Sequence, residues 1–240
     1  MLKIIIPIAG TSDIFIKAGF LYPKPLIEIN GTPMIELVID KTKSITTKHQ
    51  LIFVLKEEDV NKYHLDNTLK LLSPESQMVI LKNGTKGALC SILMTIDYVD
   101  DNDSILILNG DQIINTDFND IIDWFNLKKA DVGIVTFNSI HPRWSFAKIE
   151  NNFVVQTAEK NPISNNAIAG FYYFSNAKIF FENSFQCILN DVQLEGNFYI
   201  SPVINEFILK NKKVFNYNVE KSNYHSFYSP QMINDYLNQH

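Results

Sequence analysis

The sequence predicts an α/β fold in which a mostly parallel, mixed sheet is flanked by helices. Apolar runs of strand length alternate with helix-patterned segments through the first half, which is typical of βαβ units. Two of those runs are followed by residues that suit phosphate or metal, Gly10 and Asp111. An open parallel sheet binds its ligand at such strand ends. With 240 residues, 46% of them hydrophobic, the chain can bury a sizeable core.

The first half is predicted to supply the parallel strands and their connecting helices. Strands are expected at the apolar runs Leu2–Ala9, Leu51–Leu55, Met78–Leu81, Ser104–Leu108 and Val132–Phe137. Helices are expected where apolar residues recur at helical spacing, at Met34–Lys43, Glu57–Leu71, Ala88–Tyr98 and Asp117–Leu127. Residues 11–22 are predicted as a loop that is too long for a simple turn.

The pattern changes after Trp144. Antiparallel strands are expected at Phe146–Glu150, Phe153–Glu159 and Ala167–Phe174, with a hairpin turn at Asn151-Asn152. They are followed by helices at Ala177–Leu189, Ile200–Lys210 and Pro230–Asn238, and by a strand at Lys213–Val219. Because no linker divides the chain, we expect one domain, residues 1–240, with halves at 1–140 and 141–240.

Composition limits the classes of function. The net charge of −5 argues against a nucleic-acid surface. The apolar runs are too short for a membrane span, and no basic-then-apolar leader follows Met1, so a cytoplasmic protein is expected. Cys90 and Cys187 are too few for a disulfide framework. Arg143 is the one arginine beside twenty lysines, so a phosphate site here must rely on lysine and backbone amides.

Three residues near the strand ends have side chains or backbone that could take part in binding or catalysis. Gly10 lets backbone amides approach a triphosphate. Lys24 lies between Pro23 and Pro25, so it loses little backbone freedom on binding an anion, although exposed lysines in such turns are common. Asp111 ends a buried strand, where a carboxylate must be paired or bind a cation. Mg²⁺ held by a carboxylate and substrate phosphates is the expected arrangement, and a capping role in the next turn is the alternative.

Seven segments in order carry a resemblance to the sugar-1-phosphate nucleotidylyltransferase superfamily, most of all to its small single-domain members from capsule and lipopolysaccharide gene clusters. They are Ile5–Glu36, 85–88, Asn109-Gly110-Asp111-Gln112, His141-Pro142-Arg143-Trp144-Ser145, Ala158-Glu159-Lys160, 169–174 and 195–199. The resemblance implies a GT-A-like, Rossmann-like core with a nucleotide-binding half and an acceptor-binding half. It also implies transfer of a nucleotide from an NTP to a phosphorylated acceptor.

Site residues follow from the resemblance, position by position. It implies catalytic roles for Lys24 on the triphosphate, Lys160 on the acceptor phosphate and Asp111 as the Mg²⁺ ligand. Nucleotide contacts are implied for Ala9, Gly10, Thr11, Lys24, Gly87, Ala88 and Asn109. Acceptor contacts are implied for Glu159, Lys160, Gly170, Asn197 and Tyr199. Lys160 has a solvated strand-end position as its alternative, and only one of Tyr172 and Tyr173 is expected to reach a ligand, because they alternate across a strand.

The chain departs from the family pattern in two segments. The first loop of the family runs Gly-x-Gly-x-Arg, and the matching residues here are Gly10-Thr11-Ser12-Asp13-Ile14. The arginine is therefore replaced by Ile14, and Lys17, Lys24 or Lys160 would have to neutralise the phosphates. Ser226 stands where many members carry a second metal-binding aspartate.

Three functions follow as hypotheses. The first is a nucleotidyltransferase that transfers a nucleoside monophosphate from an NTP to a phosphorylated acceptor, a sugar 1-phosphate, for surface polysaccharide synthesis. The second is a catalytically impaired protein of the same fold that binds a nucleotide or a phosphorylated metabolite. The third is a GT-A glycosyltransferase, which the Pro23-Lys24-Pro25 segment disfavours. Phe180, Phe181 and Phe185 would supply either an apolar patch for a homodimer or part of the core.

Overall fold

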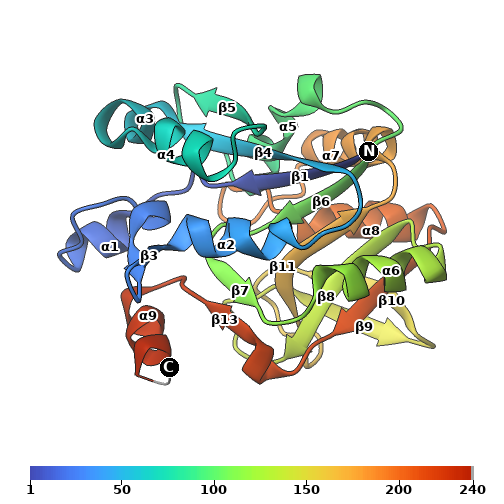
Figure 1. Cartoon of the computed structure of the whole chain (residues 1–240). Coiled ribbons are helices and arrows are strands. Elements are labelled where there is room, and N and C mark those ends of the chain that lie inside the picture. The colour runs from blue at the N-terminus through green and yellow to red at the C-terminus, as the bar shows by residue number, and fades with distance from the viewer. Residues whose placement is uncertain (239–240) are drawn as a thin grey trace.

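The computed structural model describes residues 1–238, whose central element is a nine-stranded mixed sheet (Figure 1). Along the sheet the strands run β10 (Phe153–Ala158), β9 (Phe146–Glu150), β11 (Asn166–Phe174), β6 (Ser104–Leu108), β1 (Leu2–Pro7), β4 (His49–Lys56) and β5 (Gln77–Leu81). β8 (Val132–Asn138) also pairs with β11 and with β12 (Val214–Asn218). β6, β1, β4 and β5 are parallel, whereas β11 is antiparallel to both β6 and β8. The predicted fold class is confirmed.

Helices cover both faces of the sheet because the strands are apolar on both sides. In β1, Ile4 and Ile6 face one hydrophobic cluster and Ile5 faces the other. The first cluster is closed by α2 (Met34–Lys43), α4 (Leu65–Leu72) and α6 (Phe118–Lys128). The second is closed by α5 (Ala88–Leu93), α7 (Ala177–Leu189) and α8 (Ser201–Leu209). In Figure 1, α2 and α6 lie in front of the sheet and α7 and α8 behind it.

A third, smaller cluster joins the two ends of the chain. It packs α1 (Asp13–Lys17), β2 (Glu28–Ile29), β7 (Gln112–Ile114) and α9 (Pro230–Leu237) through buried residues such as Phe15, Ile29, Ile113 and Ile233. The short strands β13 (Tyr224–Ser226) and β7 pair antiparallel, and β2 pairs with β3 (Thr32–Pro33). This cluster supports both segments that carry the predicted chemistry, since Lys24 precedes β2 and Asp111 precedes β7.

Several predicted elements differ from the structure in detail. Residues 11–22 contain the helix α1 rather than a plain loop. The helix predicted at Glu57–Leu71 is divided into α3 (Glu57–Tyr63) and α4, because His64 adopts a left-handed conformation with φ of 52°. The helix predicted at Ala88–Tyr98 ends at Leu93 and is followed by a 3-10 turn, Ile96–Tyr98. The turn at Asn151-Asn152 is confirmed, with φ of 51° and 69° as a tight hairpin requires.

The aromatic residues of α7 divide between core and surface. Phe180 and Phe181 are buried in the second cluster, so they belong to the core rather than to a surface patch. Phe185 is exposed. Across residues 1–238, none of the helices combines the length and apolar character that a bilayer crossing needs.

Gly87 joins the two halves of the chain by a close backbone contact. The N–H of Phe198 donates to the Lys86 carbonyl at 2.8 Å, and the N–H of Leu89 donates to the Phe198 carbonyl at 3.2 Å. A Cβ on residue 87 would lie 2.3 Å from that carbonyl oxygen, and φ is +96°. Only glycine tolerates this combination, so the turn before α5 depends on Gly87.

Gly87→Ala is expected to lower the free energy of unfolding by about 2 kcal/mol or more, because it adds both a strained φ and an overlap with backbone. Urea unfolding followed by circular dichroism measures the effect. Gly84→Ala is the matched control from the same loop, since nothing lies within 4 Å of a Cβ there. Equal stability of the two variants would show that the Phe198 contact relaxes without cost.

Candidate active site

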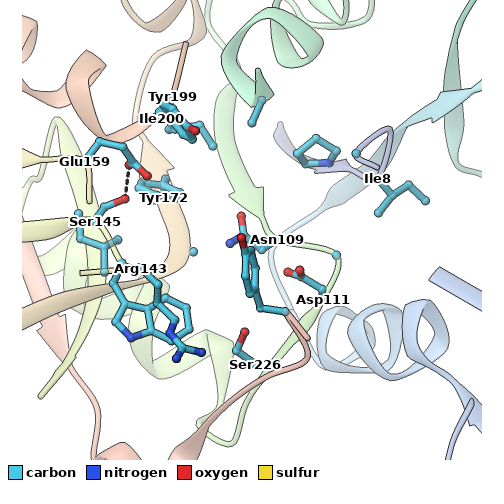
Figure 2. Close-up of a pocket in the computed structure, with 18 of the residues that line it drawn as sticks. Ile8, Asn109, Asp111, Arg143, Ser145, Glu159, Tyr172, Tyr199, Ile200 and Ser226 are labelled. Atoms are coloured by element: carbon cyan, nitrogen blue, oxygen red, sulfur yellow. Dashed lines mark hydrogen bonds between the residues drawn. The ribbon is translucent and has the colours of Figure 1, made fainter. Parts of the chain in front are cut away.

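A cavity of about 340 Å³ lies at the carboxyl ends of β1 and β6, where the two halves of the chain meet. Figure 2 shows Ile8 and Asp111 on one side of it, and Glu159, Tyr199 and Arg143 on the other. Its lining comprises Pro7, Ile8, Gly10, Lys24, Pro25, Ala88, Asn109, Gly110, Asp111, Arg143, Trp144, Ser145, Glu159, Lys160, Ile168, Gly170, Tyr172, Tyr199, Ile200, Tyr224, Ser226 and Tyr228.

Lys24 and Asp111 form an ion pair inside this cavity. The Lys24 Nζ lies 2.7 Å from the Asp111 Oδ2, and the two side chains are 23% and 15% exposed. They are 87 positions apart in sequence. Both side chains face the same cavity, so an anionic ligand bound there could contact the lysine while a cation contacts the carboxylate.

Ser12 fixes the backbone at Lys24. The Lys24 N–H donates to the Ser12 Oγ at 2.9 Å, and Ser12 is buried. Ser12 occupies the position of the family's second glycine, and here its hydroxyl ties the first loop to the Pro23-Lys24-Pro25 segment. Lys24 begins a 3-10 turn, Lys24–Leu26, whose geometry this bond helps to hold.

Ser12→Ala is expected to lower catalytic turnover roughly threefold to tenfold and stability by about 1 kcal/mol, because the Lys24 N–H loses its partner. Steady-state kinetics and thermal unfolding measure both effects. Ser44→Ala, at an exposed serine after α2, is the control and should change neither quantity. A Ser12→Ala variant as active as the parent would remove Ser12 from the site.

The opposite wall carries a carboxylate and a lysine from the end of β10. Glu159 Oε2 accepts hydrogen bonds from the Ser145 hydroxyl and, at 2.7 Å, from the Ser201 hydroxyl. Lys160 Nζ donates to the Tyr199 hydroxyl at 3.0 Å, and this bond raises the pKa of Lys160. Lys160 therefore lines the cavity with its ammonium held by Tyr199, but its side chain is also 37% exposed and its Nζ lies 3.8 Å from the Glu195 Oε2, so the residue is both solvated and part of the cavity.

Gly170 connects the strand end at Asn109 to β11. Its carbonyl accepts from the Asn109 N–H at 3.0 Å and from the Gln112 Nε2 at 2.9 Å. The register of β11 against β8 shifts between Ile168 and Tyr172, and Gly170 has φ of +58°. A Cβ there would lie 2.3 Å from the Asn109 Nδ2, so the glycine permits the close approach that shapes the cavity.

The side chains of Tyr172 and Tyr173 point to opposite faces of β11, as expected for neighbouring residues of a strand. Tyr172 lines the cavity, and burial raises the pKa of its hydroxyl, which therefore stays neutral. Tyr173 stacks on Phe125 at 5.8 Å between ring centroids, and its hydroxyl donates to Asn126 at 3.3 Å. Tyr224, from β13, also lines the cavity, and burial raises the pKa of its hydroxyl.

The cavity unites most of the predicted site residues. Those in its lining are Gly10, Lys24, Ala88, Asn109, Asp111, Glu159, Lys160, Gly170 and Tyr199. Within residues 1–238, Ala9, Thr11 and Gly87 are next to lining residues but outside the lining itself, and Asn197 lies two positions before the lining residue Tyr199. Ile14 and Lys17 are exposed on α1 and also lie outside it.

Several lining residues are not among the predicted site residues. Ser145 orients Glu159, and Arg143 and Trp144 line the cavity as a pair, with the Arg143 guanidinium 5.8 Å from the Trp144 ring centre. These three residues lie in the segment 141–145, which is one of the segments that carry the family resemblance, so that resemblance is the sequence signal that could have identified them. Tyr224 and Ser226 enter through β13, a three-residue strand without a strand pattern in the sequence, although the family pattern marks Ser226 as the position of a second metal-binding aspartate. Phe227 N–H then donates to the Asp111 carbonyl at 2.7 Å, so this strand holds the backbone of Asp111.

The metal-binding side chains of the cavity fit a cation that takes most of its ligands from a bound phosphate compound. In the described chain no group of three or more His, Cys, Asp or Glu side chains is arranged to hold a metal alone. Asp111 lies at the strand end in the cavity lining, and its carboxylate oxygens are of the kind that a hard cation prefers. One carboxylate plus substrate phosphates is a common arrangement for Mg²⁺.

Comparisons with known proteins agree with this geometry. A family model described as "Nucleotidyl transferase" matches residues 20–206. Among curated proteins, the "Bifunctional protein GlmU" of Methanococcus aeolicus is 31% identical over 164 residues, covering 66% of this chain and 36% of that protein. The protein of the same name from Methanocaldococcus jannaschii is 31% identical over 163 residues, with the same two coverages. The chain thus spans about a third of the length of these relatives.

Solved structures share the fold. A nucleoside-diphosphate-sugar pyrophosphorylase from Vibrio cholerae superimposes with a TM-score of 0.82 at 24% identity, covering 98% of this chain and all of that one (100%). A structure described as a putative glucose-1-phosphate thymidylyltransferase from Bacillus anthracis gives a TM-score of 0.75 at 19% identity, covering 100% and 95%. Since the family model covers more than half of the sequence, the chain belongs to the nucleotidyl transferase family.

Proposed function

We propose that the protein transfers a nucleoside monophosphate from an NTP to a phosphorylated acceptor, a sugar 1-phosphate, and releases pyrophosphate. One observation carries the proposal: a single cavity contains the Lys24–Asp111 pair on one wall and Glu159 with Lys160 on the other. Two polyanions could therefore meet there, each beside a lysine. The activated sugar would serve surface polysaccharide synthesis, as in capsule or lipopolysaccharide.

The chemistry requires little from the protein beyond position and charge. An oxygen of the acceptor phosphate attacks the α-phosphorus, a new P–O bond forms there, and the bond to pyrophosphate breaks. The acceptor phosphate is already ionised near neutral pH, so no protein base has to remove a proton. Catalysis then depends on alignment and on neutralising the charge that gathers at the reacting phosphorus.

The first wall would receive the triphosphate. Gly10 faces open space, with nothing within 4 Å of a Cβ there, so the loop backbone can come close to phosphate oxygens. Lys24 would bind the triphosphate and the leaving pyrophosphate. Asp111 would hold Mg²⁺, and the cation would supply positive charge that offsets the negative charge of the phosphates. Ala88 and Asn109 would lie along the nucleoside.

The second wall would receive the acceptor. Lys160 would bind its phosphate, and Tyr199 would keep the ammonium in position. Glu159 is held through Oε2 by two serine hydroxyls, so Oε1 would be available to accept from a sugar hydroxyl. Because the two serines already restrict the Glu159 side chain, Glu159 would lose little conformational entropy when it binds the acceptor.

Lys160→Met is expected to raise KM for the acceptor about tenfold or more while KM for the NTP changes little, since a charge-assisted contact to one substrate is lost. Initial rates with each substrate varied in turn measure the two constants. Lys178→Met, on α7, is the control at an exposed lysine, and both constants should stay at the parent values. A rise in KM for the NTP instead would assign Lys160 to the nucleotide.

Pyrophosphate release tests the proposal directly. The protein is incubated with Mg²⁺, each of the common NTPs, and a panel of sugar and amino-alcohol phosphates. Release with one combination of nucleotide and acceptor supports a transferase. Thermal stabilisation by a nucleotide without release in any combination would instead support a non-catalytic binding protein, the function favoured by the exposed Ile14 at the arginine position of the family.

A further inference from the structure

A second cavity, of about 710 Å³, adjoins the first one. The two share Arg143, Trp144, Tyr224 and Ser226, so these side chains form a common boundary. The proposed reaction uses none of the residues that line only the second cavity. Its size exceeds what one bound ion needs, and it would hold a small organic molecule or one part of it.

The charge around this cavity has one sign. Arg143 and Lys221 line it together with His141 and His225, and its described lining contains no Asp or Glu. This is unexpected in a chain with 26 acidic and 21 basic residues. Within residues 1–238, neither Arg143 nor Lys221 forms a salt bridge with a carboxylate. Two cations without an acidic partner therefore face the same space.

Arg143 is positioned by its neighbours rather than by a counter-charge. Its Nε donates to the His141 Nδ1 at 3.1 Å, and the guanidinium lies 5.8 Å from the Trp144 ring centre. The only arginine of the chain is thus held at the boundary of the two cavities. Each guanidinium nitrogen has one partner, since Nη2 lies 3.0 Å from the His141 Nε2 and Nη1 lies 3.5 Å from the Met232 Sδ, and two of the five N–H donors remain to bind a carboxylate or a phosphate.

The wall beside these cations is aromatic. Phe137, Trp144 and Tyr224 pack against one another, with ring centroids 4.3 Å apart for Phe137 and Tyr224 and 5.7 Å apart for Trp144 and Tyr224. Flat aromatic faces of this kind pack against carbon rings. The cavity thus offers an apolar surface for a skeleton next to a positive site for an anion.

We propose that the second cavity binds the carboxylate or phosphate of a small organic ligand whose carbon skeleton packs against Trp144 and Tyr224. Lys221 and Arg143 bind the anion. The ligand is either the acceptor of the proposed reaction, reaching across the boundary with a second anionic group, or a separate effector molecule. The acceptor version rests on the proposed function, whereas anion binding itself does not.

Binding without turnover tests the site. Trp144 and Trp124 are the two tryptophans, so a Trp124→Phe parent leaves Trp144 as the indole reporter at the boundary. Its fluorescence is titrated with D-glucuronate and with D-glucose, which has the same ring without the carboxylate. The expected Kd for glucuronate is at least about tenfold lower than that for glucose, because only the acid reaches the two cations.

Variants of residues that line only the second cavity locate the binding. Lys221→Gln should raise the glucuronate Kd about tenfold, and Ser222→Phe should block binding by filling the space. Lys70→Gln, at an exposed lysine on α4, is the matched control and should leave Kd unchanged. Equal Kd values for glucuronate and glucose, or loss of binding in Lys24→Met but not in Lys221→Gln, would overturn the proposal.

Kinetics then distinguish the two sources of the anion. If Lys221→Gln raises KM for D-glucuronate 1-phosphate but not for D-glucose 1-phosphate, the anion belongs to the acceptor. If free glucuronate changes the rate with D-glucose 1-phosphate in the parent but not in Lys221→Gln, a separate effector binds there. Either result supports the site. An absence of pyrophosphate release would refute the proposed function only, since the fluorescence titration needs no reaction.

Discussion

Asp111→Asn is expected to lower kcat/KM for pyrophosphate release by about 10³ or more, while the protein remains folded. The substitution keeps the size of the side chain but removes the negative charge that would hold Mg²⁺ and that pairs with Lys24 at 2.7 Å. Loss of one contact to the transition state costs about 10²–10³ in rate, and here the loss includes the contribution of the cation. Pyrophosphate release measured under saturating Mg²⁺ gives the ratio.

The control for this variant is Asp123→Asn, at an exposed aspartate on α6 that lies outside both cavities. It carries the same change of charge and should keep the parent rate. Mn²⁺ binding provides a second measurement that needs no turnover, and it should weaken in Asp111→Asn alone. If Asp111→Asn kept more than about a tenth of the parent activity, the carboxylate would not be the catalytic metal ligand.

Lys24→Met is expected to produce opposite effects on metal binding and on catalysis. In the ligand-free protein the ammonium neutralises Asp111, so a divalent cation must displace it before binding. Removing that competitor should raise the affinity of the protein for Mn²⁺ by roughly tenfold in the absence of nucleotide. Turnover should fall about 10²–10³, because Lys24 would neutralise the triphosphate and the leaving pyrophosphate.

Titration of free Mn²⁺ by electron paramagnetic resonance measures the first effect, and pyrophosphate release measures the second. Lys70→Met loses the same charge from the exposed side of α4 and should affect neither. If Lys24 had a merely structural role, Lys24→Met would lower both the Mn²⁺ affinity and the rate of pyrophosphate release. A rise in affinity together with a fall in rate therefore distinguishes the proposed role from a structural one. Unchanged Mn²⁺ affinity in Lys24→Met would show that the ion pair does not compete with the cation.

Most of the fold could be predicted because it depends on local patterns. β6, α2, α7 and β9 have the predicted bounds, since apolar periodicity and flanking turn residues act over a few positions. The differences occur where distant parts of the chain decide the local structure. β7 and β13 are three-residue strands that exist only through their mutual pairing, and α1 is held by Phe15 in a cluster with the C-terminal helix.

The sheet, the strand end at Asp111 and the prolines around Lys24 could be inferred from the sequence, because each depends on neighbouring residues. Folding brings together groups that are far apart in the sequence: Lys24 pairs with Asp111, the Ser12 hydroxyl accepts from the Lys24 backbone, and Ser145 and Ser201 orient Glu159. It also forms the second cavity, whose cations come from segments about eighty positions apart, Arg143 and Lys221. Hydrogen bonds and ion pairs act over a few ångströms, and chain folding rather than sequence spacing sets which groups come that close.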